Sequence, residues 1–301
     1  MDTLDAKELR LFMAVVRFGS IRAAAEHVNV APSVVSRQIA ETERNIGLSL
    51  FERNARGMTL TEAGDLVLEH SRRVLEEHSL LTEQLGFLKS VQQKRVRILC
   101  GEGFLADVLQ YGLGSFVKIY PDIQYDLQLG GTQSVLDGIA NGDADIGIAY
   151  NPLMDARVRS LAISKQSLCV ITPPHHPLLE KDKPELADCA GLPNALLGPG
   201  HGITQLVTRV AADGGFAMAP LVETTSIDVL RRFVIAGLGI SFLPRFAVST
   251  ELARHAVAVR ELSDPLLAEA SAHLMVRARR RLPLSVERLS GFLANNMAAF
   301  K

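Results

Sequence analysis

The chain has 301 residues, of which 48% are hydrophobic and 22% are charged, and its formal net charge at pH 7 is −1. This composition is typical of a globular protein with two or three compact units, and the near-zero charge excludes a protein that is basic throughout. No apolar run approaches the roughly 18 residues of a membrane-spanning helix, and the charged first residues lack the apolar core of a signal peptide. We therefore expect a cytoplasmic protein with no membrane contact.

The sequence lacks the motifs of the common enzyme and metal-site classes. It contains no phosphate-binding loop, dinucleotide fingerprint, zinc motif or nucleophile elbow, and no nucleophile, base and orienting group can be assembled from it. The cysteines, Cys100, Cys169 and Cys189, are widely spaced without a metal-ligand pattern. Cys169 is expected to be a buried filler, whereas a redox role stays open for Cys100 and Cys189. We expect a protein that is not an enzyme and that holds no metal or cofactor.

Residues 1–60 have the pattern of a winged helix-turn-helix. Apolar side chains recur at helical spacing over residues 7–18, and Gly19 ends this first helix. Ser20 is the expected N-cap of a second helix, in which small alanines let another helix cross closely. Pro32 fits the first turn of a third helix, and residues 48–60 predict a small β-wing. This arrangement indicates a domain that binds double-stranded DNA.

The exposed face of the third predicted helix carries hydroxyl and cationic side chains suited to the major groove. An arginine can donate two hydrogen bonds to guanine, and hydroxyls can reach bases or phosphates, so Ser33, Ser36 and Arg37 are the expected readers. Two arginines at the wing tip are placed for phosphate or minor-groove contact. Residues 17–59 hold six arginines against four glutamates, a local basic excess. The predicted DNA-binding residues are Arg22, Ser33, Ser36, Arg37, Gln38, Arg53 and Arg56.

A long helix is predicted over residues 61–91. Its apolar residues follow a three-four alternation over about four heptads, which is the spacing of a coiled coil. These residues are Leu60, Ala63, Val67, Val74, Leu81, Leu85 and Leu88, with His70 and His78 at the two remaining positions. We expect the helix to pair with that of a second copy; the alternative is that it packs only on its own domain.

Several short motifs of this segment have the order and spacing found in LysR-type transcriptional regulators, which the chain resembles. They are Leu9-x-x-Phe12-x-x-Val15, Gly19-Ser20, Ala24-Ala25, Ser36-Arg37-Gln38-Ile39, Leu50-Phe51-Glu52-Arg53 and Leu60-Thr61-Glu62-Ala63-Gly64. Thr42 departs from the pattern where the family often has leucine. Ala31 also departs from it, because many members carry a hydroxyl there.

From Arg95 the pattern changes to alternating strands and helices, which predicts an α/β domain with a largely parallel sheet. The expected strands are 96–99, 123–129 and 144–149, with a returning strand at 273–276, and the expected helices are 104–119 and 135–141. Residues 175–178, 195–197, 229–236 and 239–244 are expected to belong to a second lobe. Residues 116–121, 142–148, 176–178 and 234–244 resemble the effector domain of the same family. The resemblance implies that residues 92–301 form a two-lobed, periplasmic-binding-protein-like domain, whose second lobe spans about 163–266.

Glycine-rich loops at the carboxyl ends of the predicted strands mark the expected ligand cleft. Ligands of open α/β sheets bind beyond these ends, where glycines permit close approach and hydroxyls can form hydrogen bonds. The predicted effector-binding residues are Gly101, Glu102, Gly103, Thr132, Gln133, Ser134, Tyr150, His201, Thr204 and Ser226. The alternative is that the glycines only form turns and that His201 is a solvated loop residue.

Glu102 leads to a hypothesis about the charge of the effector. A carboxylate in the first loop repels an organic acid, which favours an effector with a cationic or hydrogen-bond-donating group. Alternatively, Glu102 points to water or caps its own helix electrostatically.

The resemblance implies a sequence-specific DNA-binding transcriptional regulator whose effector domain senses a small metabolite. It further implies a homodimer or homotetramer that binds an inverted repeat in promoter DNA and contacts RNA polymerase. An intracellular small-molecule-binding protein of the periplasmic-binding-protein type is the alternative.

Overall fold

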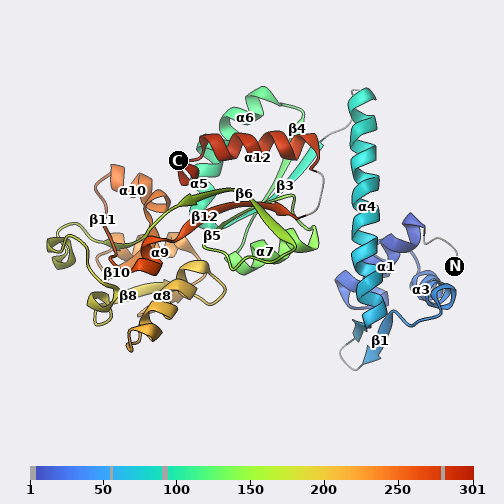
Figure 1. Ribbon diagram of the computed structural model, residues 1–301, viewed down its shortest axis with the longest axis horizontal. Coiled ribbons are helices and arrows are strands. Elements are labelled where there is room, and N and C mark those ends of the chain that lie inside the picture. Colours follow the sequence, from blue (N-terminus) through green and yellow to red (C-terminus); the bar gives the residue numbers. More distant parts are fainter. Residues whose placement is uncertain (1–4, 55–56, 90–93, 279–281) are drawn as a thin grey trace. The chain divides into compact units, whose positions relative to one another are not determined.

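The computed structural model describes residues 5–54, 57–89, 94–278 and 282–301 (Figure 1). The chain divides into two compact units, Met1–Gln92 and Gln93–Lys301, which are treated separately below. Among the described residues, no helix is long and apolar enough to cross a membrane.

The first unit is a winged helix-turn-helix followed by a long helix. Its first helix begins at a capping box formed by Asp5 and Glu8, and Gly19 in the left-handed conformation ends it. The Ser20 hydroxyl accepts a hydrogen bond from the backbone N–H of Ala23 and caps the second helix, as the sequence predicted. The elements are α1 (Ala6–Phe18), α2 (Ile21–His27), α3 (Pro32–Ile46), the antiparallel strands β1 (Phe51–Asn54) and β2 (Gly57–Leu60), and α4 (Glu62–Lys89).

A small core holds this unit together. The rings of Phe12 and Phe51 lie 5.2 Å apart, and Ala24 and Ala25 are fully buried where α2 meets its neighbours. Thr42, which replaces a common leucine, is also buried. The first turns of α4 pack against the same core.

The second unit contains two five-stranded sheets, each with helices on both faces. In the first sheet the strand order is β4 (Ile123–Leu129), β3 (Lys94–Cys100), β5 (Ile146–Tyr150), β12 (Ser271–Arg277) and β6 (Val158–Lys165). In the second it is β11 (Ala258–Glu261), β7 (Leu168–Thr172), β10 (Ile240–Pro244), β8 (Asn194–Leu197) and β9 (Val222–Thr224).

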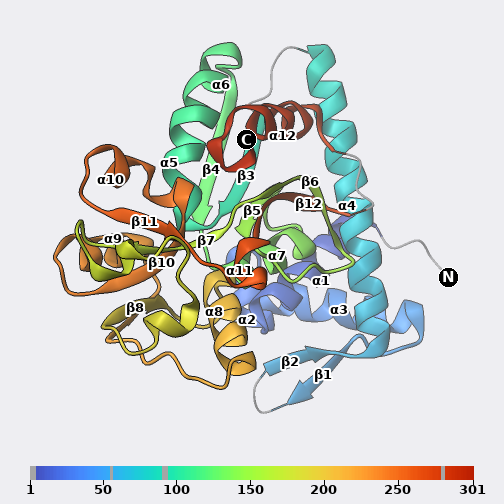
Figure 2. The same cartoon turned by 60° about the vertical axis from the view of Figure 1, so that its left-hand side comes forward.

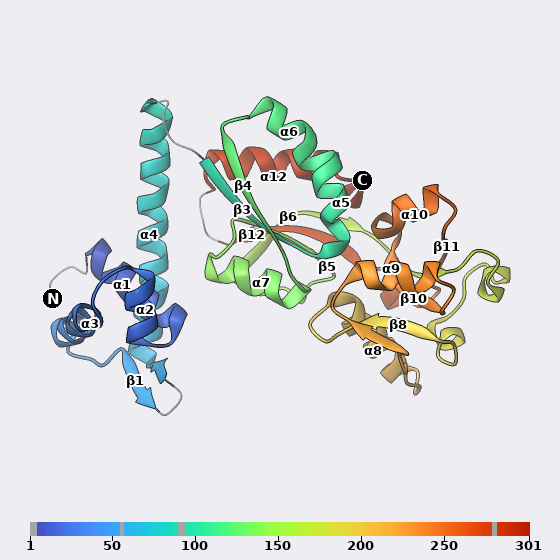
Figure 3. The ribbon, with the colours of Figure 1, turned by 180° about the vertical axis from the view of Figure 1, so that it is seen from behind.

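The helices divide between the two sheets as the α/β pattern predicts. On the first sheet, α6 (Gly114–Ile119) and α12 (Leu284–Asn296) cover one face and α7 (Thr132–Asn141) covers the other (Figures 1 and 2). On the second sheet, α9 (Ile227–Ile235) and α8 (Gly202–Asp213) lie on opposite faces (Figure 3). The shorter helices are α5 (Leu105–Asp107), α10 (Ser249–Ala253) and α11 (Pro265–Ala268).

The expectation of a largely parallel sheet is wrong. In each sheet only two of the four strand pairs are parallel: β3 with β4 and β5, and β8 with β9 and β10. The other pairs are antiparallel because the chain crosses between the sheets twice, from β6 to β7 and from β11 back to β12. Residues 163–165 also belong to β6, so they remain in the first sheet.

The continuous helix expected over residues 104–119 is interrupted. A 3₁₀ turn covers Glu102–Phe104, and a π-helical segment, Val108–Leu113, separates α5 from α6. Gly112 lies in that segment, where an added Cβ would lie 2.5 Å from a methyl carbon of Leu293 in α12. The tight helix contact therefore coincides with the interruption, a feature that helical periodicity alone does not reveal.

Candidate functional site

The outer face of α3 presents part of the predicted DNA-binding set. Ser33 and Arg37 are exposed, four residues apart on one side of the helix, and Ser36 is half-buried beside them. Gln38 is also half-buried and donates a hydrogen bond to Glu8 of α1 over 2.9 Å, so it is engaged inside the unit. Val34 is exposed on the same helix and was not predicted; its methyl groups suit contact with a thymine methyl.

The remaining predicted DNA contacts lie on α2 and the wing. Arg22 is exposed and forms an ion pair with Glu26 over 3.6 Å. Arg53 lies on β1, but its side chain, like the whole of Arg56, lies outside the described residues. The wing is attached to α3 by the Glu43 carboxylate, which accepts hydrogen bonds from the backbone N–H groups of Leu50 and Phe51.

The long helix α4 combines inward and exposed apolar residues. Val67 packs against the core of the first unit. This contact agrees with the alternative that the helix packs on its own domain. Leu81 is 53% exposed and Leu66 is 71% exposed, so apolar surface also faces away from that core. The side chains of Leu85 and Leu88 lie outside the described residues.

In the second unit, one cavity of about 390 Å³ lies between the two sheets. Its walls are the loops that follow the carboxyl ends of the parallel strands in both sheets, the arrangement that ligand sites of α/β proteins share. Eight of the ten predicted effector residues line it: Gly101, Glu102, Gly103, Thr132, Gln133, Ser134, Tyr150 and His201. Thr204 and Ser226 are not in its lining, whereas Thr225 is.

Sequence reasoning missed the apolar part of this wall. The residues concerned are Phe104, Leu129, Leu197, Ile203, Ile227, Pro244, Phe246 and Ala247. Leu129, Leu197 and Pro244 end the strands β4, β8 and β10, and an apolar residue at the end of a strand is the signal that could have found them. They make the interior of the pocket mainly apolar.

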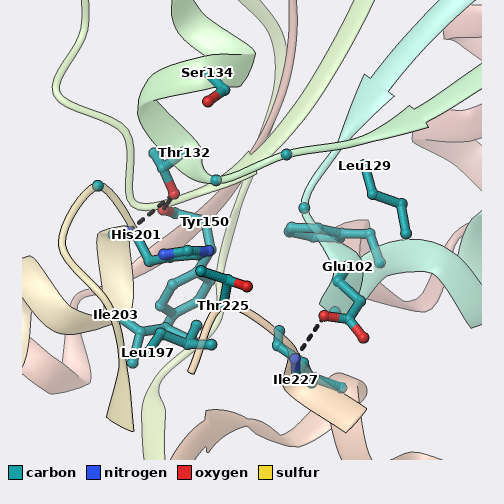
Figure 4. Close-up of a pocket in the computed structure, with 18 of the residues that line it drawn as sticks. Glu102, Leu129, Thr132, Ser134, Tyr150, Leu197, His201, Ile203, Thr225 and Ile227 are labelled. Carbon is teal, nitrogen blue, oxygen red and sulfur yellow. Dashed lines mark hydrogen bonds between the residues drawn. The ribbon is translucent and has the colours of Figure 1, made fainter. Parts of the chain in front are cut away.

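Most of the predicted hydroxyls are engaged within the protein. Thr132 donates to the carbonyl oxygen of Tyr150 and accepts from the backbone N–H of Gly202 over 2.9 Å, which joins the two lobes (Figure 4). The Tyr150 hydroxyl donates to the carbonyl of Gln166 over 2.6 Å, and the Thr204 hydroxyl donates to that of Leu197 over 2.7 Å. These groups therefore hold the walls in place.

His201 has one ring nitrogen engaged. Its Nδ1 lies 3.1 Å from the carbonyl oxygen of Gly198, and because a carbonyl can only accept, Nδ1 carries the hydrogen. In the neutral ring Nε2 is then an acceptor at the wall of the pocket. An added Cβ at Gly131 would lie 3.3 Å from Nε2, so glycine leaves room for the ring.

The Glu102 side chain is half-buried, and its carboxylate binds the other lobe rather than its own helix. It accepts hydrogen bonds from the Ser226 hydroxyl over 3.0 Å and from the backbone N–H groups of Ile227 and Asp228 over 2.6 and 3.2 Å. Glu102 therefore caps α9, which belongs to the opposite lobe (Figure 4).

The sequence matches two family models that together cover most of the chain. Residues 6–65 match the bacterial regulatory helix-turn-helix protein model of the lysR family, and residues 89–298 match the LysR substrate binding domain. The chain belongs to the LysR family. It is a transcriptional regulator with a DNA-binding helix-turn-helix domain and a substrate-binding effector domain, and not an enzyme.

Named relatives and solved structures agree with this assignment. The HTH-type transcriptional regulator CfxR of Cupriavidus necator is 25% identical over 302 residues, which cover 100% of this chain and 94% of CfxR. The transcriptional activator CmpR of Synechocystis is 28% identical over 254 residues, covering 83% of this chain and 82% of CmpR. A full-length OxyR variant from Pseudomonas aeruginosa has the same fold, with a TM-score of 0.74 at 21% identity, covering 98% of this chain and 96% of OxyR. The predicted fold class and family are thus confirmed.

The cysteines of this LysR-family regulator do not suit redox chemistry. All three are buried and free, and burial raises the pKa of the thiol to about 12 for Cys100, about 11 for Cys169 and about 12 for Cys189. Oxidation and disulfide exchange start from the thiolate, which these surroundings disfavour. Among the described residues no cluster of three or more His, Cys, Asp or Glu could hold a metal ion.

Proposed function

We propose that this LysR-family regulator binds an inverted repeat in promoter DNA as a homodimer or homotetramer, and that a small effector in the pocket between the lobes modulates this binding. The proposal rests on the pocket between the two lobes. Its walls come from both lobes, so a ligand that touches both binds one arrangement of the lobes better than another and shifts their equilibrium. RNA polymerase is the further partner that we propose for the DNA-bound regulator.

The exposed face of α3 supports base contact by Ser33 and Arg37, with Ser36 and Val34 at its border. A second helix-turn-helix, supplied by a second copy, would read the other half of the repeat. The LysR-family regulator CbnR has been solved with its target DNA; it has a TM-score of 0.56 at 18% identity and covers 96% of this chain.

Selection of genomic fragments by the purified protein, followed by footprinting, tests the DNA part. We expect a protected inverted repeat, and we expect Arg37→Ala to weaken binding to it by about 1–3 kcal/mol, because a bidentate contact with guanine is lost. Arg254→Ala, which removes an exposed arginine of the second unit, is the matched control and should bind as the wild type does. Full affinity of the Arg37 variant would show that the assigned face is wrong.

Footprints recorded with and without candidate metabolites test the effector part. We expect one metabolite to shorten or shift the protected region. Ser134 lines the pocket, so Ser134→Phe places a bulky side chain at its wall and tests whether the effector binds there. That variant should keep the footprint and lose the response. A response that survives the bulky side chain would place the effector elsewhere.

A further inference from the structure

Glu102 places a carboxylate of one lobe at the start of a helix in the other lobe. It lies in the 3₁₀ turn directly after β3 in the first lobe, yet its carboxylate sits at the first turn of α9 in the second lobe. One carboxylate oxygen accepts from the Ser226 hydroxyl and the Asp228 N–H, and the other accepts from the Ile227 N–H. Three donors therefore converge on one anionic group.

The start of α9 needs such a group. The first N–H groups of a helix have no partner within the helix, and the helix dipole favours a negative charge at this end. Ser226 is the N-cap residue, but its side chain makes no capping hydrogen bond to α9 and its hydroxyl points its hydrogen at Glu102 instead. The carboxylate from the other lobe thus does what a side chain at the N-cap usually does.

Close packing fixes the arm that carries Glu102. The ring of Phe104 stacks on that of Phe246 with centroids 4.8 Å apart, which clamps the turn against the second lobe. An added Cβ on Gly103 would lie 3.0 Å from a side-chain carbon of Ile227 and 3.4 Å from the Cβ of Ala247, so the Gly103 backbone packs closely against side chains of the second lobe. The position of Glu102 is therefore set by apolar contacts as well as by its own hydrogen bonds.

Besides α9, the helices whose first turns line the pocket are α7 and α8, where the backbone N–H groups of Gln133 and Gly202 already donate to the Gly200 carbonyl and the Thr132 hydroxyl. No lysine or arginine is among the lining residues of the pocket in the described chain, and Glu102 is the only carboxylate there. An entering carboxylate would meet a like charge and would find the donors of α9 already used. A cation is attracted by the same charge, but it would have to give up its hydration in a mainly apolar pocket, where three donors already occupy most of the acceptor positions of the Glu102 carboxylate.

What remains is an apolar wall with a few neutral polar groups. The Nε2 atom of His201 is an acceptor whenever the ring is neutral, and the hydroxyls of Ser134 and Thr225 have no hydrogen-bond partner among the described residues. These groups suit an uncharged molecule with a hydrogen-bond donor and an apolar body.

We propose that Glu102 is a built-in carboxylate ligand of α9, which restricts this pocket to uncharged, largely apolar effectors and excludes small carboxylates. The identity of the pocket as the effector site rests on the proposed function; the occupation of α9 by Glu102 does not. Glu102 is thus the residue that determines the charge of the ligand.

Three probes on one carbon frame test the selectivity: benzamide, benzoate and benzylammonium, titrated by calorimetry into the full chain. Wild type should bind benzamide at least about tenfold more tightly than either charged probe, and Glu102→Ala should gain at least about tenfold in benzoate affinity. Equal or tighter binding of benzoate by wild type overturns the proposal, and so does a preference for benzylammonium.

Acetate provides a second measurement, because it is small enough to replace the deleted carboxylate itself. Acetate should raise the melting temperature of Glu102→Ala more than chloride does at equal ionic strength, and should leave the wild type unchanged. Glu102→Gln keeps an acceptor oxygen for the Ile227 N–H and should not respond, and Glu269→Ala, which removes an exposed carboxylate outside the pocket, should not respond either. No acetate effect on Glu102→Ala, or the same effect on all variants, refutes the assignment. If Glu102→Ala does not fold, the wild-type preference among the three probes still decides.

The two proposals fail in different experiments. A footprint that no ligand alters would contradict the effector role, while acetate rescue of Glu102→Ala would still hold. A footprint that responds to carboxylates in the wild type would keep the effector role and overturn the role of Glu102.

Discussion

His273 is a buried titratable side chain on β12, between β5 and the edge strand β6 of the first sheet. Its Nδ1 and Nε2 each lie 2.9 Å from a serine hydroxyl, those of Ser160 and Ser271, and the residue is 8% exposed. Both hydroxyls can satisfy a neutral ring, one as donor and one as acceptor. Burial lowers the pKa of this histidine below its usual 6.5, because the low-dielectric surroundings disfavour the imidazolium.

This lowered pKa predicts an acid-sensitive contribution to stability. The unfolded chain binds a proton at His273 near pH 6.5, whereas the folded chain binds it only at lower pH. The contribution is therefore complete above pH 6.5 and is lost as the pH falls through that value toward the folded pKa. We expect urea unfolding of the second unit to show this loss as the pH falls below 6.5, and His273→Gln to show a flatter dependence. Identical slopes for both proteins would contradict the prediction.

At the scale of secondary-structure elements, the exposed apolar residues of α4 lead to a prediction about dimer formation. Leu81 fits the three-four alternation and is 53% exposed, so a second helix would cover it. Leu81→Glu should weaken the dimer by roughly 1.5–3 kcal/mol, the value of burying one leucine. Sedimentation equilibrium measures this, with the exposed Glu77→Gln on the same helix as the control. Unchanged association of the Leu81 variant would mean that α4 does not form the interface.

Local sequence patterns predicted the helices and strands well, but they did not predict which residues distant in the sequence contact each other. The strand over Ile123–Leu129 is observed with the predicted bounds, because the alternation of side chains and the adjacent turn are both local signals. The glycines after strands likewise led to the loops that line the pocket. The acceptor role of Glu102 at α9 could not be predicted, because its donors lie more than 120 residues away in the sequence. The antiparallel position of β12 depends on the path between lobes, which periodicity does not encode.

At the scale of the whole molecule, two units with separate hydrophobic cores share one chain. In each unit a glycine lies where a backbone oxygen leaves no room for a Cβ: Gly64 in the first unit and Gly202 in the second. An added Cβ would lie 2.2 Å from the backbone oxygen of Leu50 at Gly64, and 2.1 Å from that of Tyr150 at Gly202. In both cases the obstacle is a backbone atom, which cannot turn aside as a flexible side chain can.

These two glycines allow the independence of the units to be measured. Gly64→Ala should destabilise the first unit, and Gly202→Ala the second, each by about 1–3 kcal/mol, the usual cost of overpacking. Calorimetry should show each substitution lowering one unfolding transition and leaving the other in place, whereas Gly191→Ala, which has no atom within 4 Å of the added Cβ, should lower neither. A shift of both transitions by one substitution would mean that the units unfold together. In that case, effector binding would affect the DNA-binding unit through the coupled unfolding of the two units. Independent transitions would instead mean that the effect of the ligand is transmitted by contacts within the oligomer or by the chain connection near Gln92.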